Sequence, residues 1–371
     1  MEISVIKRHG HQKKYRILYL IMINNTIANS HTEWGTLREV IVGTVENAQI
    51  PEHKGTDIHC VDYADINQIS DLPGGKYPSE VILQTQEDLN QFAIQLQDQG
   101  IVVHRPIPLA NRSIFKTPDW KSDGYYSYCP RDGVLIVGNT MIETPMALRS
   151  RYFETFPLRH ILNEYSKAGS PHISAPKPEL LDELYDRSDL SKPTLTNKEP
   201  CFDAANVIRC GRDLFYLVSN SGNHRGAQWL QTVLGSDYKV HVMDDIYAYV
   251  HVDTSILPLA PGKVLLNPTR VNEHNLPDYF KSWDKIWAPE PVITPCLADW
   301  APGSPWIGMN ILSLSPTLVA VEERQKPLID MLEKSGFDVM TVKLTHCRTL
   351  SGGPHCVTLD TVRSDEYGDY S

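Results

Sequence analysis

The sequence predicts an α/β protein in which five ββαβ units form a pseudo-symmetric five-bladed propeller with the active site on its central axis. Two observations support this fold class. An amphipathic helix that ends at a glycine or polar residue and runs into an apolar strand recurs five times along the 371 residues. Another compact strand precedes each helix. Repetition of one supersecondary unit indicates an architecture whose units share a core.

The predicted helices carry apolar residues at helical spacing, and most end at a glycine, which favours the left-handed stop of a helix. The helix and the strand that follows it are expected at 79–100 with 101–103, 159–169 with 172–173, 226–235 with 238–242, 276–283 with 285–287, and 327–336 with 339–342.

The strands that precede the helices are rich in β-branched residues, and four of them follow a polar or glycine turn. They are expected at 39–42, 134–137, 214–218, 264–266 and 318–321. The competing architecture is an ordinary doubly wound sheet, but no Gly-x-Gly-x-x-Gly follows an early strand.

No low-complexity linker divides the chain, so we expect a single domain over residues 30–371 after a poorly ordered extension at 1–29. The apolar run 17–23 behind basic residues superficially resembles a signal peptide, but seven residues are far too few to span a bilayer. Seven scattered cysteines without a Cys-x-x-Cys pair are typical of a reducing cytoplasm. Proline-rich tracts at 176–200 and 288–307 are expected to form rims or lids.

Composition excludes several classes of function. The net charge of −10 argues against nucleic-acid binding, since no basic excess is present to neutralise phosphates. An apolar content of 41% with 22% charged residues is that of a globular protein without a membrane partner. The pairs His346-Cys347 and His355-Cys356 suggest metal ligands, but adjacent residues seldom reach one tetrahedral ion, so no metal or cofactor is expected.

The segment from Leu350 to Cys356 delivers a cysteine on a loop shaped by two glycines and a proline. A thiol on such a loop is placed for nucleophilic chemistry, although a cysteine chosen at random is more often inert. His251 and Asp253 alternate on one side of an extended segment, and Asp203 lies among small apolar neighbours.

These residue types together describe a site for a planar cation. Carboxylates can hold a guanidinium by paired hydrogen bonds and leave its central carbon open to attack by Cys356. His251 would protonate the departing amine and then deprotonate an incoming amine, which gives ping-pong kinetics.

Motifs in order along residues 30–363 resemble those of the arginine:glycine amidinotransferases. They are 33–43, 130–132, 142–147, 149–154, 175–178, 199–205, 211–213, 251–253, 260–262, 267–268, 306–310 and 352–356.

The resemblance implies a five-bladed propeller with Cys356 as nucleophile and with Asp203 and His251 as its catalytic companions. It implies Asp253 as the second guanidinium anchor, and it assigns the amino-acid end of the donor L-arginine to Asp132, Arg270 and Ser304. Arg270 suits an α-carboxylate because its fork binds carboxylates bidentately. Family members are often dimers, so a cytoplasmic homodimer is expected.

Four departures from the family pattern point to an acceptor other than glycine. They are Asn206, Gly303-Ser304, Tyr247-Ala248-Tyr249 and the acidic tail 364–367. The resemblance then favours the amidinotransferases of guanidine-alkaloid biosynthesis, such as those of saxitoxin and cylindrospermopsin, which would use a larger amine. Whether Tyr247 to Tyr249 gates the site stays open.

Four functions remain to be separated. The leading one is an amidinotransferase that uses arginine and releases ornithine. Its close alternatives are a glycine-using amidinotransferase and an arginine deiminase-type hydrolase that gives citrulline. A non-catalytic protein that binds arginine or a metal is the fourth, and unchanged turnover after replacement of Cys356 would favour it.

Overall fold

The computed structural model describes residues 26–51, 74–108, 114–189, 191–294 and 303–371. The strands of these residues form six three-stranded sheets and one two-stranded sheet. Five of the three-stranded sheets share one connectivity, in which two strands pair antiparallel and a third pairs parallel to the second. The strand pattern expected from the sequence is therefore present in all five sheets, and four of the five also have the expected α-helix.

In spatial order, the five sheets are β20 (Thr358–Ser364), β1 (Thr36–Val42) and β4 (Val102–His104); β8 (Val134–Val137), β9 (Thr140–Glu143) and β10 (His172–Ser174); β11 (Val207–Cys210), β12 (Asp213–Leu217) and β13 (Lys239–Met243); β14 (Ile256–Ala260), β15 (Lys263–Leu266) and β16 (Asp284–Trp287); and β17 (Leu312–Ser315), β18 (Leu318–Glu322) and β19 (Asp338–Val342). The remaining strands are β2 (Thr44–Ile50), β3 (Gly75–Lys76) and β7 (Tyr125–Ser127) in one sheet, and β5 (Phe115–Lys116) with β6 (Lys121–Ser122) in another.

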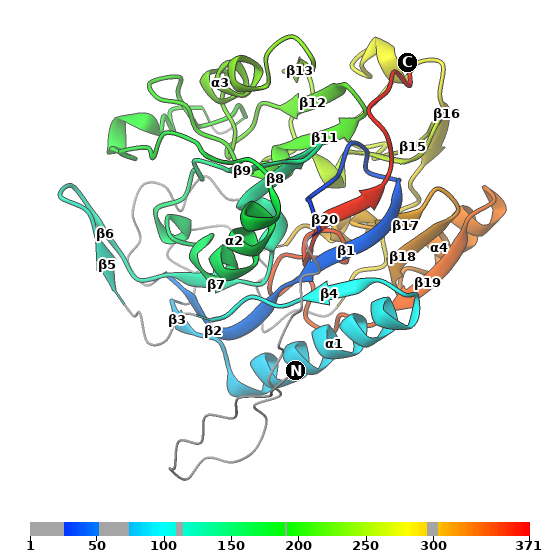
Figure 1. Ribbon diagram of the computed structural model, residues 1–371, viewed down its shortest axis with the longest axis horizontal. Helices are drawn as coiled ribbons and strands as arrows, with labels where there is room; N and C mark the ends of the chain where they lie inside the picture. Colours follow the sequence, from blue (N-terminus) through cyan, green and yellow to red (C-terminus); the bar gives the residue numbers. More distant parts are fainter. Residues whose placement is uncertain (1–25, 52–73, 109–113, 190, 295–302) are drawn as a thin grey trace.

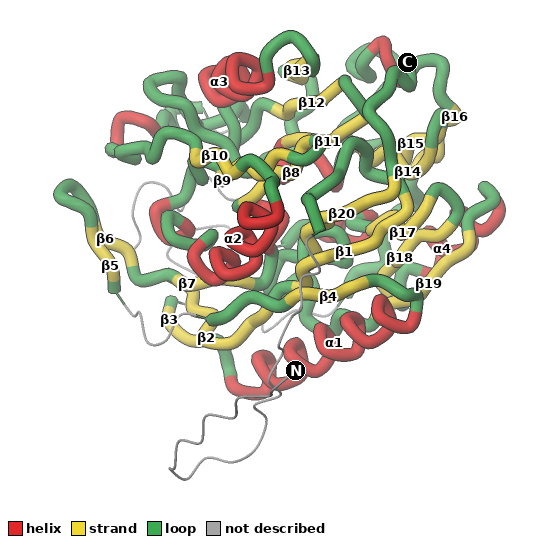
Figure 2. The backbone as a smooth tube through the Cα atoms, viewed as in Figure 1, coloured by secondary structure: helices red, strands yellow, loops and turns green. Residues whose placement is uncertain are grey.

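Four helices connect the second strand of a sheet to the third, namely α1 (Ser79–Asp98), α2 (Arg159–Ala168), α3 (His224–Leu234) and α4 (Lys326–Lys334). Gly169 ends α2 with φ of 114°, the left-handed conformation that only glycine adopts without strain. Asn223 caps α3 by accepting a hydrogen bond from the Gly226 amide at 2.9 Å. Helices α1, α3 and α4 lie at the periphery of the molecule, with the strands between them (Figure 2).

The predicted helix at 276–283 is wrong. In the structure only Asp278–Phe280 forms a 3-10 turn between β15 and β16. Pro277 restricts the chain at its start, and eight residues are too few for a stable α-helix without strong packing. Leu276, Phe280 and Trp283 are nevertheless buried, so the segment covers its sheet as a helix would.

The prediction at 134–137 is confirmed as a strand, but β8 is the first strand of its unit rather than the middle one. The strand that precedes α2 is β9, which the sequence analysis did not identify. The extension at 1–25 lies outside the described residues. Ala28 is fully buried, and the Asn29 amide donates to the Thr361 carbonyl at 3.0 Å, so the packed chain already includes these two residues.

Hydrophobic clusters join each of the five sheets to the next and the fifth back to the first. The chain ends meet in this arrangement, because β20 pairs with β1 although more than 300 residues separate them (Figure 1). Side chains that share a cluster across neighbouring sheets are Ile41 with Ile136, Leu135 with Leu214, Phe215 with Val264, Leu265 with Val319, and Ala320 with Val40.

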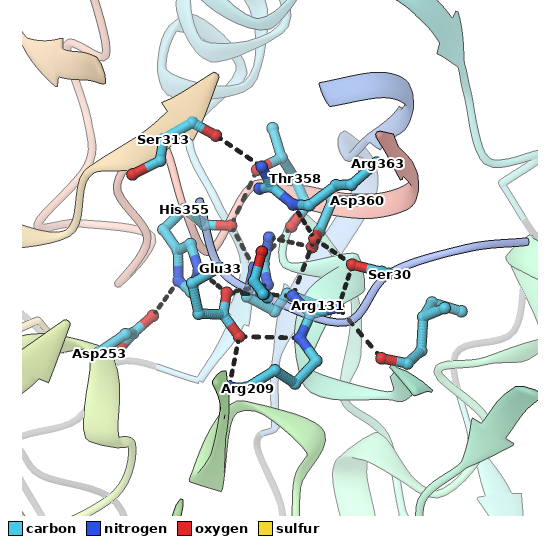
Figure 3. Close-up of polar contacts among 12 residues, drawn as sticks. Ser30, Glu33, Arg131, Arg209, Asp253, Ser313, His355, Thr358, Asp360 and Arg363 are labelled. Carbon is cyan, nitrogen blue, oxygen red and sulfur yellow. Dashed lines mark hydrogen bonds and ion pairs between the residues drawn. The ribbon is translucent and has the colours of Figure 1, made fainter. Parts of the chain in front are cut away.

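A buried ionic network lies among these sheets (Figure 3). Arg209 contacts Glu33 at 2.9 Å and Asp360 at 2.8 Å, and Asp360 also accepts from Arg131 and Arg363 at 2.7 and 2.5 Å. Burial would raise the pKa values of Glu33 and Asp360, but the neighbouring cations, Arg209 above all, lower both pKa values well below their usual range. None of the helices in the described ranges is long and apolar enough to cross a membrane.

Replacing Arg209 with methionine is expected to destabilise the protein by about 3–5 kcal/mol, because it leaves two buried carboxylates without their shared cation. Chemical denaturation measures this loss. The matched control is Lys192→Met, which removes an exposed ion pair with Asp189 and should change the free energy of unfolding by less than about 0.5 kcal/mol. Equal effects of the two substitutions would contradict a structural role for the network.

Candidate active site

Each of the five sheets carries a polar residue at the same place, two to four residues before its edge strand begins. These residues are Asp132 before β8, Asp203 before β11, Asp253 before β14, Asn310 before β17 and Cys356 before β20. All five are buried. The repeat therefore brings residues from distant parts of the sequence to one cluster.

The backbone around Cys356 is held by Asn310. The Cys356 amide donates to Asn310 Oδ1 at 2.9 Å, and Asn310 Nδ2 donates to Asp253 Oδ2 at 2.7 Å. Cys356 Sγ lies 3.5 Å from the same Asp253 oxygen. Gly353 allows this close approach, since a Cβ there would lie 2.8 Å from the Asn310 side chain. Asn310 thus fixes the thiol and the carboxylate relative to each other.

A second thiol contacts Cys356. The Cys129 and Cys356 side chains are hydrogen-bonded, and this contact, followed by burial and the charge of Asp253, raises the pKa of Cys356 well above its usual value. Cys129 itself also packs on the loop that carries Cys356, because a Cβ on Gly352 would come within 2.7 Å of its sulfur. The resting state of Cys356 at neutral pH is therefore a thiol.

Replacing Cys129 with alanine is expected to lower the pKa of Cys356, because the largest cause of its elevation is removed. The rate of Cys356 alkylation by iodoacetamide, mapped by mass spectrometry against pH, should then reach its midpoint at lower pH. Cys347→Ala, which removes another buried thiol, should leave the midpoint unchanged. An unchanged midpoint in the Cys129 variant would contradict the assignment.

His251 lies between two carboxylates, Asp203 and Asp132. Its Nε2 is 3.0 Å from Asp203 Oδ2, and its Nδ1 is 3.8 Å from Asp132 Oδ1. Burial alone would lower the pKa of His251, but the charges of Asp132, Asp203 and Asp253 and the hydrogen bond to Asp203 together raise it to about 9. His251 is therefore an imidazolium at neutral pH and can act as a general acid.

Arg151 balances the negative charge of this group. Its guanidinium contacts Asp132 at 2.8 Å, Asp203 at 3.5 Å and Glu154 at 2.5 Å. Burial is the largest influence on the Glu154 carboxyl, and it raises the pKa to about 7 despite the adjacent cation. Arg151 thus orients both carboxylates that face His251.

Two buried carboxylate oxygens have no hydrogen-bond partner among the described residues. They are Oδ1 of Asp253 and Oδ1 of Asp132. Unpaired buried acceptors are costly, so their presence in one cluster indicates a site for a donor-rich ligand. The pKa of Asp253 is nevertheless lowered, because the hydrogen bond and charge of His355, with His251 and Arg131, outweigh burial.

The residues expected at the amino-acid end of the donor do not all lie together. Arg270 Nη1 donates to Thr254 Oγ1 at 2.9 Å, directly beside Asp253. Ser304 caps the turn Pro305–Met309 that leads to Asn310. Asp132 instead contacts His251 and Arg151, because the turn Pro130–Asp132 carries it to the histidine side of the cluster.

The metal alternative finds no support in the pairs that suggested it. His346 Nε2 lies 2.8 Å from Gln84 Oε1, and His355 lies between two carboxylates. In the described part of the chain, no group of three or more His, Cys, Asp and Glu side chains is arranged to hold an ion.

The departures from the family pattern have different surroundings. Asn206 donates to the Leu217 and Val250 carbonyls at 2.9 and 3.2 Å, and so supports the residue before His251. Tyr249 has φ of 62° and an exposed ring beside Tyr247. In the acidic tail, Asp365 accepts hydrogen bonds from the His31 and Thr32 amides at 3.0 and 2.7 Å and so stabilises that turn.

Several solved structures share this architecture. The inosamine-phosphate amidinotransferase of Streptomyces griseus superposes with a TM-score of 0.90 at 47% identity, covering 92% of this chain and 99% of its own. An amidinotransferase of the saxitoxin pathway from Microseira wollei has a TM-score of 0.84 at 37% identity, covering 93% and 99%. A dimethylarginine dimethylaminohydrolase, at 15% identity with a TM-score of 0.55, shares the fold alone.

The fold and the buried cysteine, histidine and aspartate cluster define a guanidine-modifying class of enzyme. Inosamine-phosphate amidinotransferase 1 of Streptomyces glaucescens is 47% identical over 346 residues, which are 93% of this chain and 99% of that protein. An L-arginine:L-lysine amidinotransferase of Pseudomonas savastanoi pv. phaseolicola is 38% identical over 350 residues, covering 92% and 96%. The chain belongs to the amidinotransferase family. No protein-family model matches it.

Proposed function

We propose that the protein transfers the amidino group of L-arginine through a covalent adduct on Cys356 to an amine and releases L-ornithine. The observation that carries the proposal is the pair of unpartnered buried oxygens on Asp253 and Asp132. A guanidinium has five N–H donors in a plane and would satisfy both. We therefore assign Asp132, with Asp253, to the guanidinium end of the donor rather than to its amino-acid end.

The donor half-reaction needs a thiolate and an acid. The Cys356 thiol first loses its proton to water. Its Sγ then attacks the central guanidinium carbon, a C–S bond forms and a tetrahedral adduct results. His251 then gives its proton to the departing δ-nitrogen as the C–N bond breaks. L-Ornithine leaves, and the amidino group stays on sulfur.

The acceptor half-reaction uses the same residues in reverse. An incoming amine attacks the amidino carbon, neutral His251 takes its proton, and the C–S bond breaks. Asp203 orients His251 through the contact of 3.0 Å and stabilises its charged form. The product is a guanidinylated amine, and Cys356 is regenerated.

The cationic substrate itself favours the reactive thiolate. In the free site, Cys129, burial and Asp253 all hold the proton on Cys356. A guanidinium between Asp253 and Asp132 neutralises the carboxylates that oppose ionisation, so its arrival lowers the pKa of the thiol. The nucleophile is thus activated when the donor binds.

Arg270 is assigned to the α-carboxylate of arginine because its guanidinium is anchored beside Asp253. Arg270→Lys is expected to raise KM for arginine by about 10- to 100-fold, since a bidentate charge-assisted contact is lost. The KM for agmatine, which lacks the α-carboxylate, should change little in this variant. Steady-state kinetics with both donors checks this, with Arg212→Lys as an exposed control. Equal losses for the two donors would contradict the assignment.

The acceptor is proposed to be an amine of specialised metabolism. Three relatives named for inosamine phosphate are 42–48% identical to this chain, against 37% for the saxitoxin relative and 34% for a glycine amidinotransferase of Xenopus tropicalis. An amine on a phosphorylated cyclitol is therefore the first acceptor to test, before saxitoxin-type amines, lysine and glycine.

The test is incubation with guanidino-labelled arginine and these amines, followed by mass spectrometry. Ornithine together with a labelled guanidinylated amine supports the proposal. Citrulline formed independently of added amine would establish the hydrolase instead. Absence of both products with intact arginine binding would favour a binding protein.

We further propose that the five sheets close into a five-bladed propeller with this cluster on its axis, and that residues 30–371 act as one domain. The cyclic order of the hydrophobic clusters supports closure. A cytoplasmic homodimer remains the proposed state. Measurement of the molar mass by light scattering tests the dimer.

A further inference from the structure

His355, the residue before the nucleophile, lies between two buried carboxylates (Figure 3). Its Nδ1 is 2.9 Å from Asp253 Oδ2, and its Nε2 is 3.3 Å from Glu33 Oε2. The ring is only 4% exposed. A neutral imidazole carries one N–H and could serve only one of these acceptors, whereas the doubly protonated ring donates to both.

Glu33 is itself held as a carboxylate. Arg209 donates to Glu33 Oε1 at 2.9 Å and to Oε2 at 3.0 Å, and it contacts Asp360 on its other side. Arg209 therefore fixes the carboxylate that faces His355 from the side away from Asp253. In a buried setting these contacts are strong, because no water screens them.

The consequence falls on Asp253. Its Oδ2 accepts from His355 and Asn310 and faces the thiol, whereas its Oδ1 has no partner in the described part of the chain. The carboxylate is thus fixed by one oxygen, with the other left for a ligand. The charged or titratable groups that face it are His355 and Cys356 from the nucleophile turn, His251 from its own segment and Arg131.

We propose that His355 is a positioning residue, which contacts Asp253 Oδ2 through Nδ1 and so orients Asp253 with Oδ1 towards the guanidinium of the donor. Glu33, itself fixed by Arg209, holds the ring from its other side. His355 acts through Asp253 and touches neither the donor nor the reacting atoms. The inference rests on the proposed use of arginine and adds a residue to that site.

The test measures arginine binding by calorimetry in a Cys356→Ala background, where turnover cannot occur. Adding His355→Asn keeps a short hydrogen-bond donor near Asp253 but removes the imidazole. Arginine affinity is expected to fall about tenfold, and to fall further as the pH is lowered, because burial raises the pKa of Asp253 once the contact with His355 is lost. The arginine affinity of the parent should change less over the same pH range.

The matched control is His346→Asn, which changes the other His-Cys pair of the same segment and should bind like the parent. Equal arginine affinity of the His355 variant and the parent at every pH would overturn the proposal. A loss of affinity that does not depend on pH would also overturn it, because a merely structural role would produce such a loss. If the parent does not bind arginine at all, the proposed function fails instead.

A measurement on the unaltered protein covers the case in which His355→Asn does not fold. In ¹⁵N-histidine spectra, Nδ1 of His355 should carry a proton that it donates to Asp253 Oδ2. An Nδ1 without a proton would overturn the proposal whether or not ornithine is formed.

Discussion

Replacing Cys356 with alanine is expected to lower ornithine formation by about ten-thousandfold or more, because the covalent step loses its nucleophile. Arginine binding should persist, since Asp253, Asp132 and Arg270 remain. Coupled assays of ornithine release, with calorimetry for binding, separate these two quantities. The combination of lost turnover and retained binding distinguishes a chemical role from a folding defect.

The control for this variant is Cys210→Ala, which removes a fully buried thiol from β11 in the same fold. It should retain turnover, with a modest loss of stability. Substantial ornithine formation by the Cys356 variant would contradict the covalent mechanism and would favour either a different nucleophile or direct transfer.

Replacing His251 with asparagine is expected to lower kcat by about 10²- to 10⁴-fold, because the departing amine loses its proton donor. The pH profile gives a second readout. The reactive pair of thiolate and imidazolium has one proton fewer than the resting pair of thiol and imidazolium. The value of kcat/KM for arginine should therefore rise with pH until about 9, the pKa of His251.

In the His251 variant the remaining proton must leave Cys356 itself, whose pKa is well above its usual value. The pH at which kcat/KM stops rising should consequently be higher. His241→Asn is the matched control, because His241 also contacts an aspartate, Asp213, at 2.6 Å but lies in β13. If kcat/KM of the His251 variant still rises only until about pH 9, a group other than His251 controls this pH dependence.

The third strands, and the second strands other than β9, could be predicted because their residues are apolar and flank amphipathic segments. Most of the first strands could not. In two of them, polar groups of the ionic network interrupt the apolar pattern, as Arg209 does in β11 and Asp360 and Arg363 do in β20. Arg209 pairs with Glu33 and Asp360, each more than 100 residues away, so no local pattern marks β11.

The central site residues could be predicted because Cys356, His251 and Asp253 stand in short motifs. Asn310 and Cys129 could not, since their roles arise only from contacts with Cys356 across 46 and more than 200 residues. The adjacency of His355 to Cys356 suggested a metal ligand, whereas the structure gives it two carboxylate partners. Sequence spacing indicates which residues can react but not which distant groups charge and orient them.

The covalent step is the central claim, and peptide mass spectrometry tests it most directly. The protein is incubated with guanidino-labelled arginine in the absence of acceptor, quenched in acid and digested. We predict one labelled amidino group on the peptide that contains Cys356, ornithine in stoichiometric amount, and loss of the label when an acceptor amine is added. Transfer of the amidino group to an acceptor without any adduct, or citrulline as the main product, would contradict the account.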